Sequence, residues 1–342
     1  MENYLLDEKA VFTRFPSLYE AVSIHLVEVS PTMRVMQTDA IQQAASRAGR
    51  DPPPVSWHDD FQNIPTGLPT FVLAHEFFDA LPVHQFRKTQ MDWREVLVAV
   101  HDSDVHGERG FCFINSPTRS VAQAAYLPLA GDLTHRDCVE IAPRSLVILD
   151  QICHRIQTDK GAALIVDYGH SGDKKLTLRG FRNHQVCDPL EDPGNIDLTC
   201  DVDFSLFHRR ITSSNLEVHG PEPQAYFLIN MGILARLQTL MVNCTSKDQQ
   251  DELFSGCEML ITAEQMGERF KFLAVVPRGD RKRALPGFTD LPGTPYAAGF
   301  SLRLATLMRE RINEKATLIG SSYRLSSTMP LTQAPPRSVL NL

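Results

Sequence analysis

The segment TFVLAHEFFDALP, residues 70–82, joins a short apolar run to a cluster of acidic and aromatic side chains. Residues 70–74 have the short, apolar composition of a strand buried in a parallel sheet. Glu76 and Asp79 follow directly after this run. In open α/β sheets, ligands bind beyond the carboxyl ends of the strands. The segment therefore predicts a buried strand that carries two carboxylates to a functional edge of a sheet.

Similar apolar runs recur along the chain and alternate with amphipathic segments. Further strands are predicted at residues 22–29, 55–58, 162–168 and 270–276. Helices are predicted at residues 31–47, 145–158, 226–241 and 248–260. This alternation is typical of an α/β fold with an open, largely parallel sheet covered by helices. Two extended segments, residues 93–100 and 110–114, interrupt it and predict an inserted antiparallel unit.

Other acidic residues share the placement of Glu76 at the end of a strand. Glu28, Asp59 and Asp167 each lie at or just past the end of a predicted strand. Because the carboxyl ends of parallel strands meet at one edge of a sheet, we expect Glu28, Glu76 and Asp167 to line one cleft.

Composition limits the classes of function. The chain has 342 residues and a formal net charge of −7, which argues against a general nucleic-acid binder with clustered Lys and Arg. No apolar run reaches the ~20 residues of a membrane helix, so no membrane span is predicted. The seven cysteines form no CxxC pair, and His75, His84 and His170 lack metal-ligand spacing, so no metal site is predicted. The acidic first eight residues do not have the composition of a transit peptide.

Six blocks of sequence are distinctive in their residues and in their order along the chain. They read HLVEVS at residues 25–30, LAHEFFDALPVH at 73–84, ALIVDYGH at 163–170, RGF at 179–181, DLTCDVDF at 197–204 and MGERF at 266–270. Together they resemble the MidA-like family of S-adenosylmethionine-dependent methyltransferases, and its mitochondrial members more than its bacterial ones. The resemblance covers roughly residues 10–278. It implies a class I methyltransferase fold, with a Rossmann-like sheet and an inserted antiparallel unit.

The domain organisation follows from the same resemblance. Residues 1–278 are expected to form the methyltransferase domain, and residues 77–142 the insertion within it. Residues 279–342 are expected to form a C-terminal extension, partly disordered because they are rich in Pro, Ser and Thr.

The resemblance also implies an activity, a partner and a location. S-adenosylmethionine is the implied cofactor, and its methyl group is transferred to a guanidinium nitrogen of a protein arginine. The implied protein substrate is a core subunit of respiratory complex I, modified during assembly. The implied location is the mitochondrial matrix.

Roles for the cofactor-binding and catalytic residues come from matching the family motifs. The resemblance places Glu28 on the ribose hydroxyls, Asp59 beside the adenine amino group and His75 in the cofactor site. Glu76 and Asp79 are the implied catalytic residues, since a carboxylate pairs bidentately with a guanidinium and can aim one nitrogen at the methyl group.

Substrate-lining roles are implied for four residues: Asp167, Tyr168, His170 and Asp203. Structural alternatives stay open for several of the acids. Glu28 could be a surface residue, and the Asp59–Asp60 pair a solvated turn. Asp79 could cap the turn that follows it, and Asp167 could cap a helix.

The sequence departs from the family near its beginning. The family starts with a strand and a glycine-rich turn, roughly E-x-G-P-G-R-G-T-L, whose amides hold the methionine end of the cofactor. Gly49 is the first glycine here, so the first strand and glycine-rich loop are expected to be missing from this N-terminally truncated form. The neighbouring strands would then have unpaired edges, and cofactor affinity should be weaker than micromolar.

Two alternative functions follow from these observations. The first is a catalytically impaired or inactive assembly factor that binds a complex I subunit without methyl transfer. The second is a hydrolase that uses Glu76 and His170, which no Gly-x-Ser-x-Gly motif supports.

Overall fold

The computed structural model describes residues 16–49, 51–102, 109–183, 185–279 and 285–288. The described residues divide into two compact units, residues 16–66 and residues 67–288. The expectations for residues 1–9 and for nearly all of the C-terminal extension concern segments outside the described residues.

The unit of residues 16–66 is built on two parallel strands joined by a helix. Its elements are α2 (Pro16–Ala21), β1 (Ile24–Val27), α3 (Pro31–Ala48), β2 (Val55–His58) and η1 (Phe61–Asn63). The register pairs Ile24 with Val55 and Val27 with His58. Ser30 caps α3 by accepting the N–H of Met33, which fixes where the chain turns from β1 into the helix. The predicted strands and helix of this segment are confirmed, with β1 shorter than expected.

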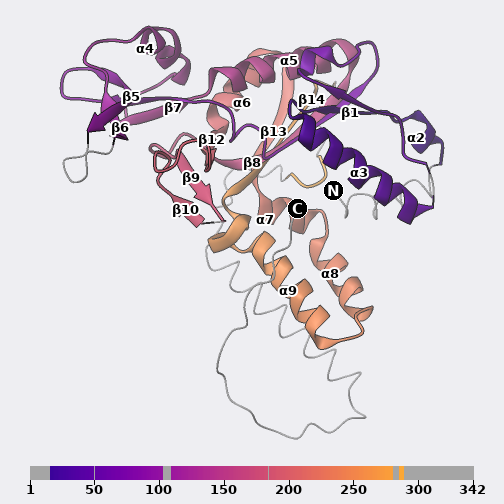
Figure 1. Cartoon of the computed structure of the whole chain (residues 1–342). Coiled ribbons are helices and arrows are strands. Elements are labelled where there is room, and N and C mark those ends of the chain that lie inside the picture. The colour runs from indigo at the N-terminus through magenta and orange to yellow at the C-terminus, as the bar shows by residue number, and fades with distance from the viewer. Residues whose placement is uncertain (1–15, 50, 103–108, 184, 280–284, 289–342) are drawn as a thin grey trace, which may run out of the picture. The chain divides into compact units, whose positions relative to one another are not determined.

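The unit of residues 67–288 contains a mixed five-stranded sheet. Its strands are β3 (Thr70–His75), β8 (Gly161–His170), β12 (Val202–Asp203), β13 (Leu216–Pro223) and β14 (Phe270–Pro277). β3 and β12 pair with β8 in parallel, while β14 is antiparallel to both β8 and β13. The sheet is therefore largely parallel, as predicted, with β14 as its antiparallel strand (Figure 1).

Strand β3 is less buried than its composition predicts. Phe71 is 81% exposed and Leu73 is 49% exposed, whereas Ala74 is buried. Within the described part of the chain, β8 is the only strand that pairs with β3, and β2 is the only strand that pairs with β1. The prediction that residues 70–74 are buried throughout is wrong, because the face of β3 that carries Phe71 and Leu73 is left uncovered.

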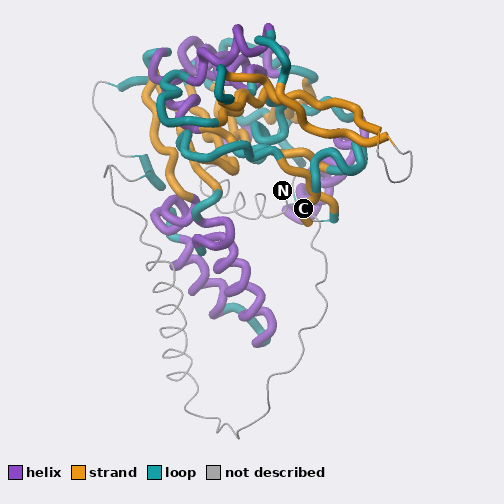
Figure 2. Tube along the Cα trace, turned by 90° about the vertical axis from the view of Figure 1, so that its left-hand side faces the viewer, coloured by secondary structure: helices purple, strands orange, loops and turns teal. Residues whose placement is uncertain are grey.

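Helices cover the sheet and extend from it. They are α5 (Pro143–Asp159), α6 (Phe204–Ser213), α7 (Gln224–Asn230), α8 (Ile233–Val242), α9 (Lys247–Ile261) and the π-helical turn η3 (Ala263–Gly267). α5 packs against β3, β8 and β14, and α6 packs against β8 and β13. Gly169 allows this approach, since a Cβ there would lie 2.3 Å from the Phe204 ring. Figures 1 and 2 show α8 and α9 side by side, extending away from the sheet.

The single helix predicted at residues 226–241 is wrong. The chain forms α7 and α8 instead, because Gly232 adopts a left-handed backbone conformation (φ 86°) that ends the regular helix. No single helix among the described residues is long and apolar enough to cross a membrane. Of the helices that the structure describes, only α7 and α8 taken together reach that length and composition, and the chain bends by 66° between them.

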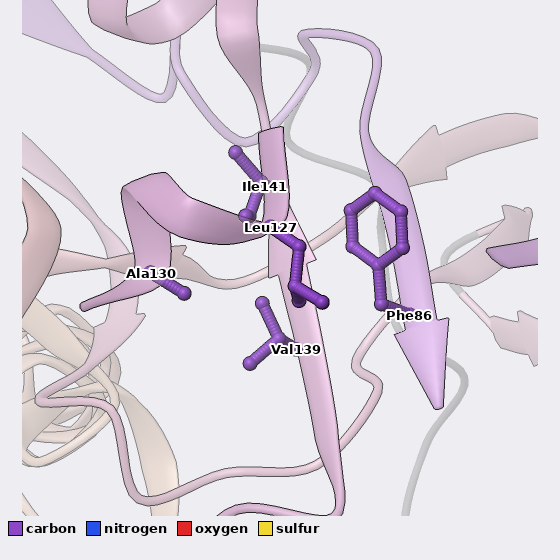
Figure 3. Packing of buried hydrophobic residues seen from close by; sticks show 5 residues of the cluster. All are labelled: Phe86, Leu127, Ala130, Val139 and Ile141. Atoms are coloured by element: carbon purple, nitrogen blue, oxygen red, sulfur yellow. The ribbon is translucent and has the colours of Figure 1, made fainter. Parts of the chain in front are cut away.

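A separate antiparallel sheet lies between β3 and α5 in the chain. Its strands are β4 (His84–Lys88), β5 (Trp93–Asp102), β6 (Arg109–Asn115) and β7 (Cys138–Ile141), in the order β6-β5-β4-β7. The predicted extended pair is confirmed as β5 and β6, which pair antiparallel. Phe86, Val139 and Ile141 pack with the short helices α4 (Val121–Tyr126) and η2 (Leu127–Ala130) around a small core (Figure 3). The proposed limits of the insertion, residues 77–142, stay a prediction.

A small three-stranded sheet follows β8 and was not predicted. It contains β9 (Arg179–Arg182), β10 (Gln185–Cys187) and β11 (Asp197–Thr199), in the order β10-β9-β11. Both β10 and β11 pair antiparallel with β9. The sheet leads the chain from β8 back to β12, next to the carboxyl end of β8.

Candidate active site

The carboxyl ends of β3 and β8 bring together several of the predicted site residues. The parallel pairing of the two strands runs to His75 opposite Val166, and the Glu76 N–H then donates to the Val166 carbonyl at 2.9 Å. Asp167 and Tyr168 are the next residues on β8. The strand pairing therefore fixes where the chain leaves β3 and where Glu76 begins the loop that follows.

Asp167 is fully buried and its carboxylate faces this loop. Oδ2 accepts the backbone N–H groups of Phe77, Phe78 and Asp79 at 3.2, 2.9 and 3.3 Å, and Oδ1 accepts the N–H of Tyr168 at 2.9 Å. Burial raises the pKa of Asp167 to about 7, repulsion from Asp79 adds to the rise, and the amide hydrogen bonds oppose it. The carboxylate therefore holds backbone rather than lining an open surface.

Glu76 is the exposed carboxylate of the group. Its backbone is left-handed, with φ 47°, a conformation that costs a non-glycine residue about 1–2 kcal/mol. Partial burial of the carboxyl group raises its pKa, His75 lowers it and Asp79 raises it further. Such strain persists where surrounding contacts fix the conformation, and it is frequent at functional sites.

Asp79 is buried one turn further along the loop. Its Oδ2 accepts the Thr199 hydroxyl at 2.7 Å, and its backbone carbonyl accepts the Cys200 N–H at 3.0 Å. Its Oδ1 is buried and has no hydrogen-bond partner among the described residues. Asp79 therefore links the loop after β3 to β11, and one of its oxygens still lacks a donor.

Tyr168 contributes an aromatic surface beside these acids. Its ring packs on Phe270 with centroids 4.1 Å apart, and the guanidinium carbons of Arg179 and Arg269 lie 5.7 and 5.6 Å from its centre. Burial raises the pKa of the Tyr168 hydroxyl, and the negative charge of Glu76 adds to the rise. Arg179 and Arg269 thus bring positive charge close to the acidic residues.

His75 is exposed at the end of β3, with its ring 6.4 Å from that of Phe270. It therefore lies beside Glu76, and the cofactor-binding role predicted for it stays a prediction.

His170 and Asp203 face each other where β8 pairs with β12. The His170 Nδ1 accepts the Gly172 N–H at 2.9 Å, and burial lowers the pKa of this histidine. Asp203 caps α6: its Oδ1 accepts the Ser205 N–H at 3.0 Å, and its Oδ2 accepts Arg136 Nη2–H at 2.9 Å. Both side chains have structural partners, and their substrate-lining roles stay predictions.

Two buried carboxylates in the same region were not predicted. Glu140 accepts the N–H groups of Thr177 and Leu178 at 2.8 and 3.1 Å. Asp201 is paired with Lys174 and Arg179; burial alone would raise its pKa, but the hydrogen bonds from these two cations lower it. Asp201 lies in the DVDF block and could have been singled out there, whereas no sequence signal marks Glu140.

The residues predicted to hold the adenosine part of the cofactor lie in the unit of residues 16–66. Glu28 follows β1, is half-buried, and its Oε1 accepts the Ser30 N–H at 2.8 Å. Gln37 donates to Glu28 Oε2 at 3.4 Å and accepts Trp57 Nε1–H at 2.9 Å. Asp59 pairs with Arg34 at 2.5 Å. This network orients Glu28 at the carboxyl end of a strand.

The Glu28 environment fits a nucleoside ribose. An ionised carboxylate offers about four lone-pair sites, and only two are used by Ser30 and Gln37. The remaining sites suit the two hydroxyls of a ribose, the same pairing as in dinucleotide-binding folds. Asp60, next to Asp59, instead caps η1 by accepting the Gln62 N–H.

A small cavity lies in the larger unit, and the described residues hold no cluster suited to a metal ion. The cavity measures about 30 Å³ and is lined by Phe78, Ser145, Cys200 and Asp203, among others. This volume holds a water molecule or two, not a nucleoside. Ser145 Oγ, which is buried there without a partner among the described residues, fits such a water.

Comparisons with known proteins identify the family of this chain. Residues 4–222 match the family described as "Putative S-adenosyl-L-methionine-dependent methyltransferase". The chain belongs to this methyltransferase family. S-adenosylmethionine is accordingly its methyl donor, and the resemblance to MidA-like proteins is confirmed.

Curated relatives are more than a third identical to this chain over the aligned residues. Protein arginine methyltransferase NDUFAF7, mitochondrial, from Xenopus tropicalis is 39% identical over 299 residues, which cover 82% of this chain and 68% of the frog protein. The human protein of the same name is 39% identical over 78% of this chain and 62% of its own length. The Drosophila melanogaster homolog is 38% identical over 79% of this chain and 64% of its own. These names support a mitochondrial location.

Solved structures agree with the fold. An uncharacterized Burkholderia thailandensis protein superposes with a TM-score of 0.62 at 26% identity, covering 78% of this chain and 68% of its own. A B. thailandensis structure with bound S-adenosyl-homocysteine gives 0.61 at 26% identity, covering 78% and 66%. The predicted Rossmann-like methyltransferase fold is confirmed.

Proposed function

We propose that this methyltransferase acts on arginine side chains of a protein. The names of the curated relatives support this specificity. The observation that carries it here is an exposed carboxylate, Glu76, at the carboxyl end of β3, with Asp79 and Tyr168 beside it. Arginine stays protonated at ordinary pH, so a concentration of negative charge suits it.

In methyl transfer the main task of the protein is to position the arginine side chain relative to the methyl group. S-adenosylmethionine supplies an activated methyl group when bound. Glu76 would pair with the guanidinium, draw its positive charge toward the paired nitrogens and leave another nitrogen free to attack the methyl group. The bond between the methyl group and the cofactor sulfur would break, and the methylated nitrogen would lose a proton to water. Asp79, whose buried Oδ1 lacks a donor among the described residues, adds negative potential behind Glu76. Glu28 would hold the ribose hydroxyls of the cofactor.

The names of the relatives support a proposal for the substrate and the compartment. We propose a core subunit of respiratory complex I as the protein substrate, methylated during assembly in the mitochondrial matrix. The mitochondrial names of the relatives and the resemblance of the HEFFDALPVH block to the mitochondrial members support this proposal.

Methyl transfer from radiolabelled S-adenosylmethionine to purified complex I core subunits tests the proposal. The key variant is Glu76→Gln, which keeps the shape of the side chain and removes its charge. Loss of one charge-assisted hydrogen bond, about 1.5–3 kcal/mol, predicts at least a roughly tenfold lower rate. Glu252→Gln, which removes the same charge from the exposed surface of α9, is the control and should leave the rate unchanged.

Each outcome separates the candidate functions. Equal rates for the wild type and Glu76→Gln would show that Glu76 is structural. Wild-type chain that binds a core subunit but labels none would favour the inactive assembly factor. Labelling of a residue other than arginine would refute the proposed specificity.

A further inference from the structure

The conformation of Glu76 is fixed from both sides. On one side its own N–H donates to the Val166 carbonyl at 2.9 Å. On the other side the next three amides all donate to one oxygen of Asp167. Glu76 thus sits at φ 47° between two anchors that both belong to β8.

The second anchor is a side chain, the Asp167 carboxylate. Residues 77–79 belong to no helix or strand, so backbone partners from regular structure are not available to them. Phe78 adds an apolar anchor: it is 1% exposed and its ring packs edge-on against Phe207 at 4.9 Å. Asp167 supplies the polar partner that the amides of this buried loop require.

A substrate-lining role for Asp167 does not fit this arrangement. Its exposed fraction is 0%, and its two oxygens already accept four backbone N–H groups. A guanidinium that reached it would have to displace the loop that carries Glu76.

We infer that Asp167 is the positioning residue of Glu76, holding the loop of residues 77–79 by its backbone amides so that the Glu76 carboxylate is presented to the substrate guanidinium. This inference rests on the proposed function for its catalytic part. Asp167 acts through Glu76, and its contribution to methyl transfer disappears when Glu76 has no charge to present.

A double-mutant cycle of Asp167→Asn and Glu76→Gln tests the inference in the full chain. An amide at position 167 keeps one neutral acceptor oxygen and puts a donor group where the other stood, so it can no longer satisfy both the loop amides and the Tyr168 N–H. Asp167→Asn should lower kcat for methyl transfer about tenfold when Glu76 is present, and by less than about twofold in the Glu76→Gln background. A substitution that only loosened the fold would lower kcat by the same factor in both backgrounds.

Glu140→Gln is the matched control. Glu140 is a buried carboxylate that also accepts two consecutive backbone amides, those of Thr177 and Leu178, but these amides lie outside the loop of residues 76–79. Any effect of Glu140→Gln on kcat should be the same with Glu76 and with Gln at position 76. An effect that depended on residue 76 to the same degree as that of Asp167→Asn would overturn the inference.

Hydrogen–deuterium exchange tests the inference without measuring methyl transfer, and the wild-type chain alone already gives one of its results. The amides of residues 77–79 should exchange slowly in the wild type although they lie outside helices and strands. In Asp167→Asn they should exchange at least about tenfold faster, while β14 stays protected. Free exchange of these amides in the wild type would overturn the inference. If the wild type transfers no methyl group, the proposed function fails while exchange still decides whether Asp167 holds the loop.

Discussion

Asp203 joins α6 to the segment that precedes β7, and its removal is expected to destabilise the larger unit. Its Oδ1 accepts the backbone N–H groups of Ser205 and Leu206 at 3.0 and 3.4 Å, and its Oδ2 accepts Arg136 Nη2–H at 2.9 Å. The two paired side chains are only 5% and 13% exposed. Asp203→Asn keeps an oxygen that can cap the helix but removes the charge, whereas Asp203→Ala removes both.

The two contributions can be estimated separately. A hydrogen bond to a charged group contributes about 1.5–3 kcal/mol, so Asp203→Asn should lower the free energy of unfolding by about 2 kcal/mol. Loss of an N-cap costs about 0.5–2 kcal/mol, so Asp203→Ala should cost about 1 kcal/mol more. Both substitutions leave the largely buried Arg136 without a carboxylate partner, so both are expected to destabilise the fold.

The two tryptophans of the chain make the measurement possible. Trp57 lies in the unit of residues 16–66, and Trp93 packs against the Phe86 core in the unit of residues 67–288. In a Trp57→Phe background, Trp93 fluorescence during urea unfolding therefore reports on the unit that contains Asp203. The control is Asp188→Asn, because Asp188 also accepts a backbone amide, that of Leu190, but is exposed.

The outcomes are distinct. Asp188→Asn should change the free energy of unfolding by less than about 0.5 kcal/mol. If the free energy of unfolding of Asp203→Asn lies within the same margin of the wild-type value, the ion pair with Arg136 adds no stability. That result would refute the reasoning from burial. Equal values for Asp203→Asn and Asp203→Ala would show that the cap adds none.

Three further outcomes are expected. Glu28→Gln should weaken S-adenosylmethionine binding about tenfold or more in calorimetric titration, since one charge-assisted contact is lost, while Asp39→Asn on the exposed part of α3 should not; equal affinities would contradict the ribose role. Burial raises the pKa of Asp167 to about 7. The stability that Asp167 contributes is therefore complete at pH values below the ordinary pKa of an aspartate, and it is lost as the pH rises to about 7. Over this range the free energy of unfolding should fall by about 1.4 kcal/mol per pH unit in the wild type, and this fall should be absent in Asp167→Asn. The same pH dependence in both proteins would refute the prediction. Thr199→Val leaves the buried Asp79 without its hydroxyl donor and should cost about 1–3 kcal/mol in urea unfolding; an unchanged midpoint would contradict the role of that bond.

Strands whose composition is apolar could be predicted from sequence alone. Residues 55–58 form β2, and residues 70–74 form β3 with one residue added. Local composition was sufficient here because each run is short, carries Val, Phe or Trp side chains, and is bounded by polar or Pro-rich segments. It could not reveal that Phe71 is 81% exposed, because exposure depends on which neighbours cover the strand.

Strands that depend on distant partners were missed. β9 is polar in composition, and its strand conformation depends on pairing with β10 and β11. The break between α7 and α8 was missed for a different reason. The apolar periodicity continues through residues 226–241, and only the left-handed conformation of Gly232 interrupts the helix.

The predicted site residues are partly brought together, and burial separates their roles. Strand-end position marked Glu76 and Asp167 alike, and both do lie where β3 meets β8. A sequence gives no measure of how many amides a carboxylate accepts. Asp167 and Glu140 accept several, which makes each a structural anchor of a loop.

The electrostatics of the loop after β3 favour a cationic ligand over a neutral one. Glu76 and Asp79 each contribute negative charge within four residues, and Asp167 lies behind them. Partial burial raises the pKa of the Glu76 carboxyl, His75 lowers it, and the nearby Asp79 raises it further. A guanidinium placed on Glu76 would supply the missing positive charge and pair with an oxygen that is exposed. Asp167, fully buried and already occupied by backbone amides, could not do the same. We therefore propose Glu76 rather than Asp167 for the substrate contact, with Asp167 as the residue that fixes its geometry.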